Sequence, residues 1–335
     1  MQSILNVINT GLTQTTLVLE PPASITLNQT TLAYKRIGRH QKTFSRPLQE
    51  GHWEETLQLR NRNVLLGGYD GYVPEMVRAE GDATIFCHDE IIAVMRAAFA
   101  PLGGKYRMLA QLPSTSGKVV ADLVCFQDDV NKVIALLELK RPGYINVTQW
   151  SQQDLRNANE HTQRLTRKIR RYAHEYDCTQ YLLFDCCTLL KIEFEATGNE
   201  IQNTDRINIE IAYDTRYEQR AHVIQVLGRG EDYATVRAVI YSSILAGIRR
   251  HLFANIQPAT ISPPDGSNYV YLGWTPWSGG PLWYNDQNQT LQLRDPFGWT
   301  HFIERYAAQN DDRRGFRFRI VYIINGAQHE MIRDI

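Results

Sequence analysis

The sequence predicts an α/β fold built around a central mixed β-sheet. Two β-branched apolar runs, Val119–Phe126 and Val133–Leu139, flank a polar turn, which is the pattern of a β-hairpin. Apolar residues at helical spacing predict a helix over Asp82–Phe99, ended by a Pro-Leu-Gly-Gly stretch, and a long polar helix is expected over Ser151–Tyr176. Helices and strands that alternate along the chain in this way indicate an α/β core.

Further strands complete the expected core. Tyr106–Leu112 is the candidate first strand, and the apolar runs Gln180–Cys186 and Thr188–Glu195 are good candidates for closing strands. Arg206–Tyr213 is another strand candidate. A helix is expected over Asp232–Phe253, and its apolar stripe indicates core packing or a subunit contact, so a homodimer is one assembly that the sequence allows.

Length and composition predict more than one structural unit. A chain of 335 residues can bury a sizeable core, and 43% hydrophobic with 21% charged residues is ordinary for a soluble globular protein. Polar and Pro-rich stretches suggest boundaries between four parts. These parts are an N-terminal extension packed on the core (1–80), a core (81–196), a helix and strand extension of it (197–256) and an aromatic, β-rich C-terminal part (257–335).

The cysteines and the hydrophobic runs favour an intracellular protein. Five cysteines show no C-x-x-C spacing, and most lie in or beside apolar runs, so we expect reduced core residues rather than disulfides or a zinc site. The first twenty residues lack the basic and apolar regions of a signal peptide. No run reaches the ~20 apolar residues that span a bilayer. We therefore expect no membrane partner.

The predicted hairpin carries charges where core residues are expected. Side chains alternate along a strand, so Glu138 and Lys140 point to the same side, about 6–7 Å apart. Asp122 lies in the partner strand, and pairing of the two strands can bring it beside Glu138. Two carboxylates and an ammonium are then expected on a largely apolar sheet.

A divalent cation would balance such a group. Burying unpaired charges costs several kcal/mol per ion, and Mg²⁺ binds one or two carboxylates while keeping waters and accepting phosphate oxygens. A nearby lysine can orient a water or offset developing charge. The structural alternative is a plain Glu138–Lys140 ion pair, or charges at a solvated strand end.

Asp122, followed after fifteen residues by Glu138-Leu139-Lys140, resembles the active-site motif of the PD-(D/E)XK nuclease superfamily. The resemblance covers about a third of the chain, and it implies a restriction-endonuclease-like core with the order α-β-β-β-α-β. Ala121 stands where the motif has its least constant residue, a proline. The superfamily implies a magnesium- or manganese-dependent nuclease whose metal ligands are Asp122 and Glu138 and whose catalytic lysine is Lys140.

The resemblance also implies residues on the two core helices. Many members place a further acidic residue on the first helix, facing the metal. Glu90 is the candidate by position, with Asp89 and Glu80 as alternatives. The second helix often carries a glutamine and a tyrosine. Gln163 and Tyr172 are the possible counterparts, although Gln152 competes and the spacing from Gln163 to Tyr172 is not the tight Q-x-x-x-Y of some members.

The second predicted helix is basic, which suggests phosphate contacts beside the candidate metal site. The alternative is a charged outer face of a packed helix. The net charge of the chain is zero, so any nucleic acid must be held by local patches of this kind. The candidate nucleic-acid-binding residues are Arg164, Arg167, Lys168, Arg170, Arg171 and Tyr172.

The sequence therefore predicts a metal-dependent phosphodiesterase acting on nucleic acid, with DNA expected rather than RNA and endonuclease action expected. A competing hypothesis is an inactive nuclease-like protein that only binds nucleic acid or protein, as a recognition or effector-like module. The intact Asp-Glu-Lys set favours the enzyme, and the neutral net charge favours the binding protein.

Overall fold

The computed structural model describes residues 2–13, 15–19, 24–42, 48, 57–65, 76–127, 131–213, 234–254, 269–275, 280–285, 290–294, 300–305, 317–324 and 327–334. The chain divides into two compact units. The first comprises Met1–Glu50 and Glu54–Leu245, and the second comprises Gly51–Trp53 and Ala246–Ile335. The predicted core and its extension thus fall mainly in the first unit, and the predicted aromatic part falls in the second.

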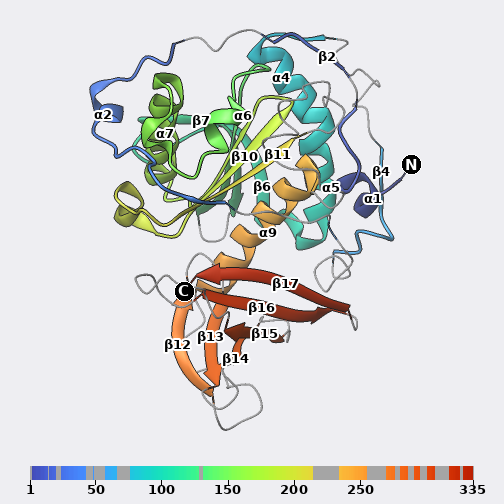
Figure 1. The fold of residues 1–335 in the computed structure, drawn as a ribbon. Helices are drawn as coiled ribbons and strands as arrows, with labels where there is room; N and C mark the ends of the chain where they lie inside the picture. Colours follow the sequence, from blue (N-terminus) through green and yellow to red (C-terminus); the bar gives the residue numbers. More distant parts are fainter. Residues whose placement is uncertain are drawn as a thin grey trace. The chain divides into compact units, whose positions relative to one another are not determined.

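The first unit contains a seven-stranded mixed sheet in the order β3-β11-β10-β9-β8-β7-β6 (Figure 1). Neighbouring strands are antiparallel except β8 with β9 and β11 with β3, which are parallel. This sheet confirms the predicted α/β class with a central mixed sheet. Its strands are β3 (Gln41–Lys42), β6 (Tyr106–Pro113), β7 (Val120–Gln127), β8 (Lys132–Leu139), β9 (Gln180–Phe184), β10 (Thr188–Phe194) and β11 (Ile207–Tyr213).

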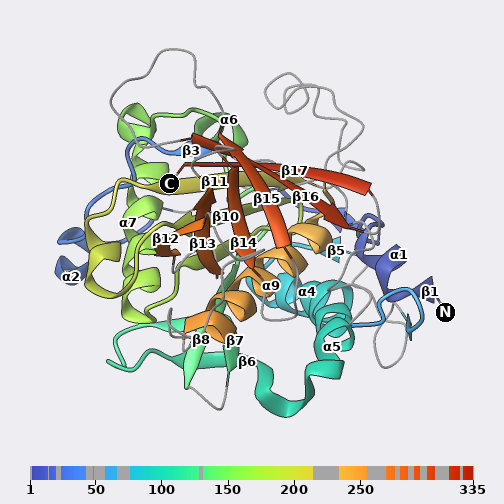
Figure 2. The same ribbon diagram turned by 90° about the horizontal axis from the view of Figure 1, so that it is seen from below.

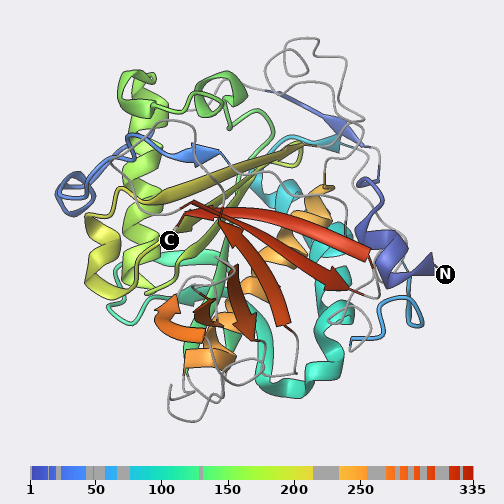
Figure 3. The same ribbon diagram turned by 60° about the horizontal axis from the view of Figure 1, so that its bottom comes forward.

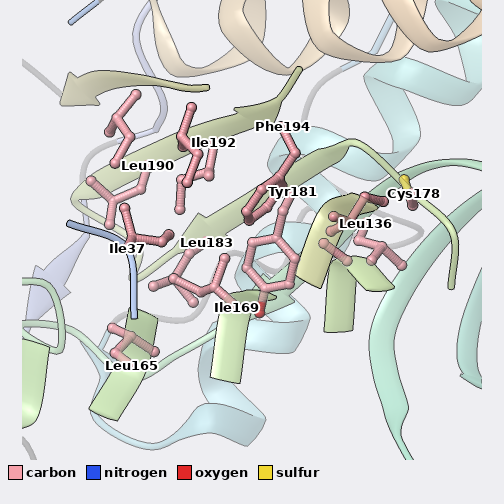
Figure 4. Packing of buried hydrophobic residues seen from close by; sticks show 14 of the residues in the cluster. Ile37, Leu136, Leu165, Ile169, Cys178, Tyr181, Leu183, Leu190, Ile192 and Phe194 are labelled. Carbon is pink, nitrogen blue, oxygen red and sulfur yellow. The ribbon is translucent and has the colours of Figure 1, made fainter. Parts of the chain in front are cut away.

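Helices cover both faces of this sheet. Helix α7 lies on one face, and α4, α5 and the part of α9 that belongs to the first unit lie on the other (Figures 1 and 4). Ser243 of α9 donates a hydrogen bond of 2.9 Å to Gln180 of β9, which ties that helix to its face. The helices and helical turns after residue 79 are α4 (Glu80–Cys87), the π-helical turn η1 (His88–Ile92), α5 (Ala93–Phe99), η2 (Ala100–Lys105), α6 (Val147–Trp150), η3 (Leu155–Asn157), α7 (Glu160–Glu175), η4 (Gly198–Gln202) and α9 (Val236–Ala254).

An apolar core fills the space between the sheet and α7. Leu165 and Ile169 of α7 are buried and face Tyr181 and Leu183 of β9 (Figure 4). Burial of one such aliphatic side chain contributes roughly 1.5–3 kcal/mol. The amphipathic pattern of α7 thus determines which face of the helix packs on the sheet. This packing also sets the position of α7 relative to β8.

Helix α7 begins later than the sequence predicts. The expected helix starts at Ser151, but Asn159 is the N-cap, and its side chain accepts the Thr162 N–H at 2.8 Å. Asp154 similarly accepts the Arg156 N–H at 3.0 Å and supports the 3₁₀ turn η3. Short polar side chains that bond to nearby backbone amides favour turns and caps over a continuous helix, which explains the difference.

The described part of residues 1–80 belongs to the first unit. Helix α1 lies beside α5, as Figure 2 shows. Two small sheets join distant parts of this segment, β1 with β4 antiparallel and β2 with β5 parallel. The elements are β1 (Gln2–Ser3), α1 (Ile4–Ile8), β2 (Thr16–Leu17), α2 (Gln29–Leu32), β4 (Asn63–Val64) and β5 (Met76–Val77).

The second unit contains a six-stranded antiparallel sheet. Its strands, orange to red in Figure 3, follow one another in sequence order across the sheet. Residues 257–268, 276–279 and 306–316 of the predicted aromatic part lie outside the described residues. The strands are β12 (Tyr269–Thr275), β13 (Gly280–Asn285), β14 (Thr290–Arg294), β15 (Thr300–Arg305), β16 (Arg317–Ile324) and β17 (Ala327–Asp334).

The cysteines are free thiols, as the sequence predicts. Cys87, Cys125, Cys178 and Cys186 are buried, and Cys187 is half-buried. None of the helices that the structure describes combines the length and the apolar character needed to cross a bilayer.

Tyr176 joins the end of α7 to the hairpin of β6 and β7. Its hydroxyl accepts the Ala121 N–H at 2.8 Å and donates to the carbonyl of Leu112 or Val119. Replacing Tyr176 with Phe removes the acceptor and leaves the buried Ala121 N–H unpaired. We expect Tyr176→Phe to lower the free energy of unfolding by about 1–3 kcal/mol in urea titrations.

Tyr144→Phe is the matched control, because the structure assigns its hydroxyl no hydrogen bond within the described residues. The control is expected to stay within about 0.5 kcal/mol of the wild-type chain. Equal stability of the two variants would contradict the assigned role of the Tyr176 hydroxyl.

Candidate active site

The site is built where β7 and β8 diverge. The two strands pair from Gln127 opposite Lys132 to Leu123 opposite Leu137. Beyond Leu137, strand β8 continues beside β9, while the start of β7 continues beside β6. Asp122 lies at this fork, and its Oδ2 accepts the Leu139 N–H at 2.8 Å. The carboxylate thus takes the place of a backbone acceptor at the point where the ladder ends.

Lys140 gathers three carboxylates around one ammonium. Its Nζ lies 2.7 Å from Glu80 Oε1, 3.0 Å from Glu138 Oε1 and 3.7 Å from Asp122 Oδ2. The backbone holds it there, because the Lys140 N–H donates to the Phe184 carbonyl of β9 at 2.8 Å. The side chains of Glu138 and Lys140 are buried, whereas that of Glu80 is 57% exposed. The site therefore lies at the margin of the core, open on the Glu80 side.

A second lysine reaches the site from α7. Lys168 Nζ lies 2.8 Å from Glu138 Oε1, the same oxygen that contacts Lys140. The Lys168 ammonium also lies 5.3 Å from the ring centroid of Tyr172, four residues further along the helix. Residues four apart share a helix face, so Lys168 and Tyr172 face the site together.

These contacts shift the pKa values in opposite directions. Burial alone raises the pKa of Glu138, but Lys168 and Lys140 outweigh it, so the pKa is lowered. Burial alone lowers the pKa of Lys140, but Glu138, Glu80 and Asp122 outweigh it, so the pKa is raised. For Asp122, burial and then the charge of Glu138 raise the pKa above its usual range. The charged form of Lys140 is thus stabilised by its surroundings, whereas the charged form of Asp122 is destabilised.

The charges and the unpaired atoms of the site suit a further cation. Three carboxylates face two ammonium groups, which leaves an excess of negative charge. Two buried atoms, Glu138 Oε2 and the Tyr181 hydroxyl, have no hydrogen-bond partner among the described residues. Within the described ranges, no group of three or more His, Cys, Asp or Glu side chains has the arrangement of a metal site. A divalent ion would therefore be held by Asp122 and Glu138, a donor number that suits Mg²⁺.

Glu90 is not brought to this group. Its Oε2 accepts the Thr13 N–H at 2.7 Å and pairs with Arg237, and both charged side chains are fully buried. A carboxylate committed to a buried arginine is poorly placed to hold a metal. Asp89 contacts its neighbour His88, and Glu80, the other alternative for the first helix, contacts Lys140.

Gln163 is also bonded elsewhere. Its amide donates to the carbonyl of Ala158 at 2.6 Å and accepts from Arg36, so it closes the turn that precedes α7. The competing Gln152 is exposed in the turn that follows α6. Of the residues predicted on the second helix, Lys168 and Tyr172 are the two that the structure places beside Glu138 and its lysines.

The four predicted phosphate-binding arginines of α7 bond to the protein itself. Arg170 donates to the carbonyls of Ile201 and Thr204, and Arg171 donates to Thr31 and the carbonyl of Lys118. Both of these arginines are buried, so neither is positioned to reach a phosphate. The remaining two reach carbonyls of the N-terminal segment. They are Arg164, which bonds to Ile25, and Arg167, which bonds to Leu32 and Tyr34.

Two residues that the sequence analysis did not single out line the site. Gln111 of β6 donates to Asp122 Oδ1 at 3.3 Å, and its backbone φ of 52° lies in the left-handed region. The ring centroid of Tyr144, in the segment after Lys140, lies 6.0 Å from the Lys140 ammonium. A non-glycine residue with positive φ is uncommon, and here it lies beside the fork. The one sequence feature that could have predicted a role for Tyr144 is its position four residues after Lys140 of the motif.

The chain was compared with protein-family models, with curated proteins and with solved structures. None of the three comparisons found a match. The function is therefore inferred from the geometry of the site.

Arg170 should act on stability. Removing it leaves the carbonyls of Ile201 and Thr204 without their donor and opens a cavity beside Phe194, whose ring lies 5.5 Å from the guanidinium. We expect Arg170→Ala to lower the free energy of unfolding by roughly 2–4 kcal/mol in urea titrations. Arg156→Ala, at an exposed arginine of the preceding turn, is expected to leave the free energy of unfolding close to that of the wild-type chain. A fully stable Arg170→Ala chain would contradict the structural role.

Asp122 should make stability depend on pH. Its raised pKa means that the folded chain binds this proton more tightly than the unfolded chain, so its contribution to stability falls as the pH rises through the raised pKa. Asp122→Asn removes that loss and can still accept from Leu139. We expect the variant to be more stable than wild type at pH 7, with the difference shrinking toward about pH 3, below the usual aspartate pKa.

Urea titrations across this pH range measure the effect. Asp205→Asn is the control, because this exposed aspartate forms a surface pair with Lys35. The control difference is expected to stay within about 0.5 kcal/mol. An Asp122→Asn chain that is less stable than wild type at pH 7 would refute the electrostatic assignment.

Proposed function

We propose that the chain is a metal-dependent nuclease that hydrolyses phosphodiester bonds of nucleic acid, with DNA as the expected substrate. The observation that carries the proposal is the group of Asp122, Glu138 and Lys140 at the fork of β7 and β8, with negative charge in excess and a buried carboxylate oxygen unpaired. The alternative of a simple surface ion pair explains neither the burial of these groups nor their excess negative charge.

The order of elements supports a restriction-endonuclease-like core as part of this proposal. Helices α4 and α5 precede three antiparallel strands, β6, β7 and β8, and α7 then leads to β9, which pairs with β8 in parallel. This is the α-β-β-β-α-β order that the motif implies. The motif residues lie on β7 and at the end of β8, the second and third strands of that order.

The protein side chains would divide the work as follows. A divalent cation held by Asp122 and Glu138 would lower the pKa of bound water and neutralise charge on the scissile phosphate. Lys140 has a raised pKa and three N–H donors, so it acts as a positive donor rather than as a proton acceptor. Lys140 and Lys168, which both contact Glu138, would donate to phosphate oxygens or orient the attacking water.

The test is cleavage of end-labelled single- and double-stranded DNA and RNA with Mg²⁺, Mn²⁺ or EDTA. We expect metal-dependent cutting that falls at least about 100-fold in Glu138→Gln and in Lys140→Met, the typical loss when one group that stabilises the transition state is removed. Lys132→Met is the matched control, because Lys132 lies on the same strand but pairs with Asp177 away from the site. It should cut as wild type does.

Two further measurements make the result decisive. Circular dichroism establishes that each variant is folded, and calorimetric titration with Mn²⁺ tests whether the wild-type chain binds a cation that Glu138→Gln does not. A folded wild-type chain that neither cuts nor binds Mn²⁺ would refute the nuclease. Binding of nucleic acid without cutting would then favour the alternative, an inactive nuclease-like binding module.

A further inference from the structure

Two half-buried tyrosines accompany the two lysines of the candidate active site. The Lys140 ammonium lies 6.0 Å from the ring centroid of Tyr144, and the Lys168 ammonium lies 5.3 Å from that of Tyr172. Both lysines contact the same oxygen of Glu138. Each cation that can reach a phosphate thus has an aromatic ring beside it.

Both rings are supported from the protein side. Tyr144 meets the edge of His161, at 4.8 Å between ring centroids and 72° between planes. Tyr172 meets Tyr181 at 6.3 Å and 89°. Such edge-to-face contacts hold the rings in place, and both tyrosines keep part of their surface exposed, unlike the buried Tyr181. Burial raises the pKa of Tyr172 to about 12, so its ring stays neutral.

The rest of α7 offers little to a duplex. Arg170 and Arg171 are buried, and Arg164 and Arg167 donate to backbone carbonyls of the N-terminal segment. Proteins that hold duplex DNA through its backbone often neutralise about 6–10 phosphates. Single strands are held differently, by aromatic rings on which bases stack beside a few cations.

We infer that this site takes single-stranded nucleic acid, with the bases next to the scissile phosphate stacked on Tyr144 and Tyr172. The inference rests on the proposed nuclease function and specifies its substrate. A base stacked on either ring would bring its phosphate near a lysine, because each ring centroid lies within 6.0 Å of the Lys140 or the Lys168 ammonium. A stiff duplex keeps its bases paired and stacked on one another, so neither ring can receive one.

The test measures binding in EDTA, which separates it from cutting. A fluorescein-labelled 20-nucleotide single strand and a hairpin duplex of the same composition are titrated with the wild-type chain, Tyr144→Leu, Tyr172→Leu and the corresponding Phe variants. We expect wild type to prefer the single strand, each Leu variant to weaken that binding about tenfold, and each Phe variant to bind within about threefold of wild type. Duplex binding should change little in any variant.

A second readout reports stacking directly. The single strand carries 2-aminopurine next to its central phosphate, and its fluorescence should change on binding to wild type and the Phe variants but much less with the Leu variants. Equal binding by wild type and both folded Leu variants, or a wild-type preference for the duplex, would overturn the inference. Loss of single-strand binding on removal of the rings supports the stacking surface even if the chain cuts nothing, whereas metal-dependent cutting of duplex alone refutes the inference and leaves the nuclease standing.

Discussion

The contact on which the site depends is the ammonium of Lys140 among the carboxylates of Glu80, Glu138 and Asp122. Charges this close to the core are tolerated when each has an opposite partner at short range. Lys140 is bonded on both its side chain and its main chain, since its N–H donates to β9. A shift of β8 relative to β9 would therefore disturb the charge balance and the sheet together.

The turn between β9 and β10 holds the segment that follows Lys140. The buried carboxylate of Asp185 accepts the Ile145 N–H at 2.9 Å and the Thr188 N–H at 2.8 Å. It thereby ties the segment that follows Lys140 to the β9–β10 turn, in which Cys186 has a φ of 67°. Burial raises the pKa of Asp185, and the backbone donors oppose that rise. The loop that carries Tyr144 is thus anchored by the hydrogen bond from its Ile145 N–H to the buried Asp185 carboxylate.

The hydrophobic pattern of the sequence predicted the elements whose structure depends on neighbouring residues. The two hairpin strands follow from alternating β-branched residues, and the structure places β7 and β8 within a residue of the expected limits. The expected approach of Asp122 to Glu138 was derived from the pairing of those strands, and in the structure both carboxylates contact Lys140. The contacts that the sequence could not predict join distant segments. Glu90 meets Arg237, 147 positions away, inside a buried region that no local spacing reveals.

The helix that carries Glu90 also departs from α-helical geometry, because the turn η1 is π-helical. An extra residue in one turn rotates the following side chains, so extrapolation along an ideal helix assigns them to the wrong face. Among the acidic residues considered for the first helix, Glu80, which precedes this turn, is the one that contacts Lys140. Arg170 and Arg171 likewise have partners in other helical segments, Ile201 of η4 and Thr31 of α2, which charge counting on α7 alone cannot identify.

The arginine contacts of α7 also bear on how the proposed nuclease would bind a polyanion with a net charge of zero. Guanidinium groups bonded to carbonyls of the N-terminal segment stabilise the fold but add little to a phosphate-binding surface. In the proposed nuclease, attraction for a nucleic acid would therefore come from the site itself, from Lys140, Lys168, a divalent cation and aromatic surface. Each phosphate contact that is absent reduces the salt dependence of binding. Under the proposed function, such a site would select a substrate through the one or two nucleotides that enter it, rather than through a long series of backbone contacts.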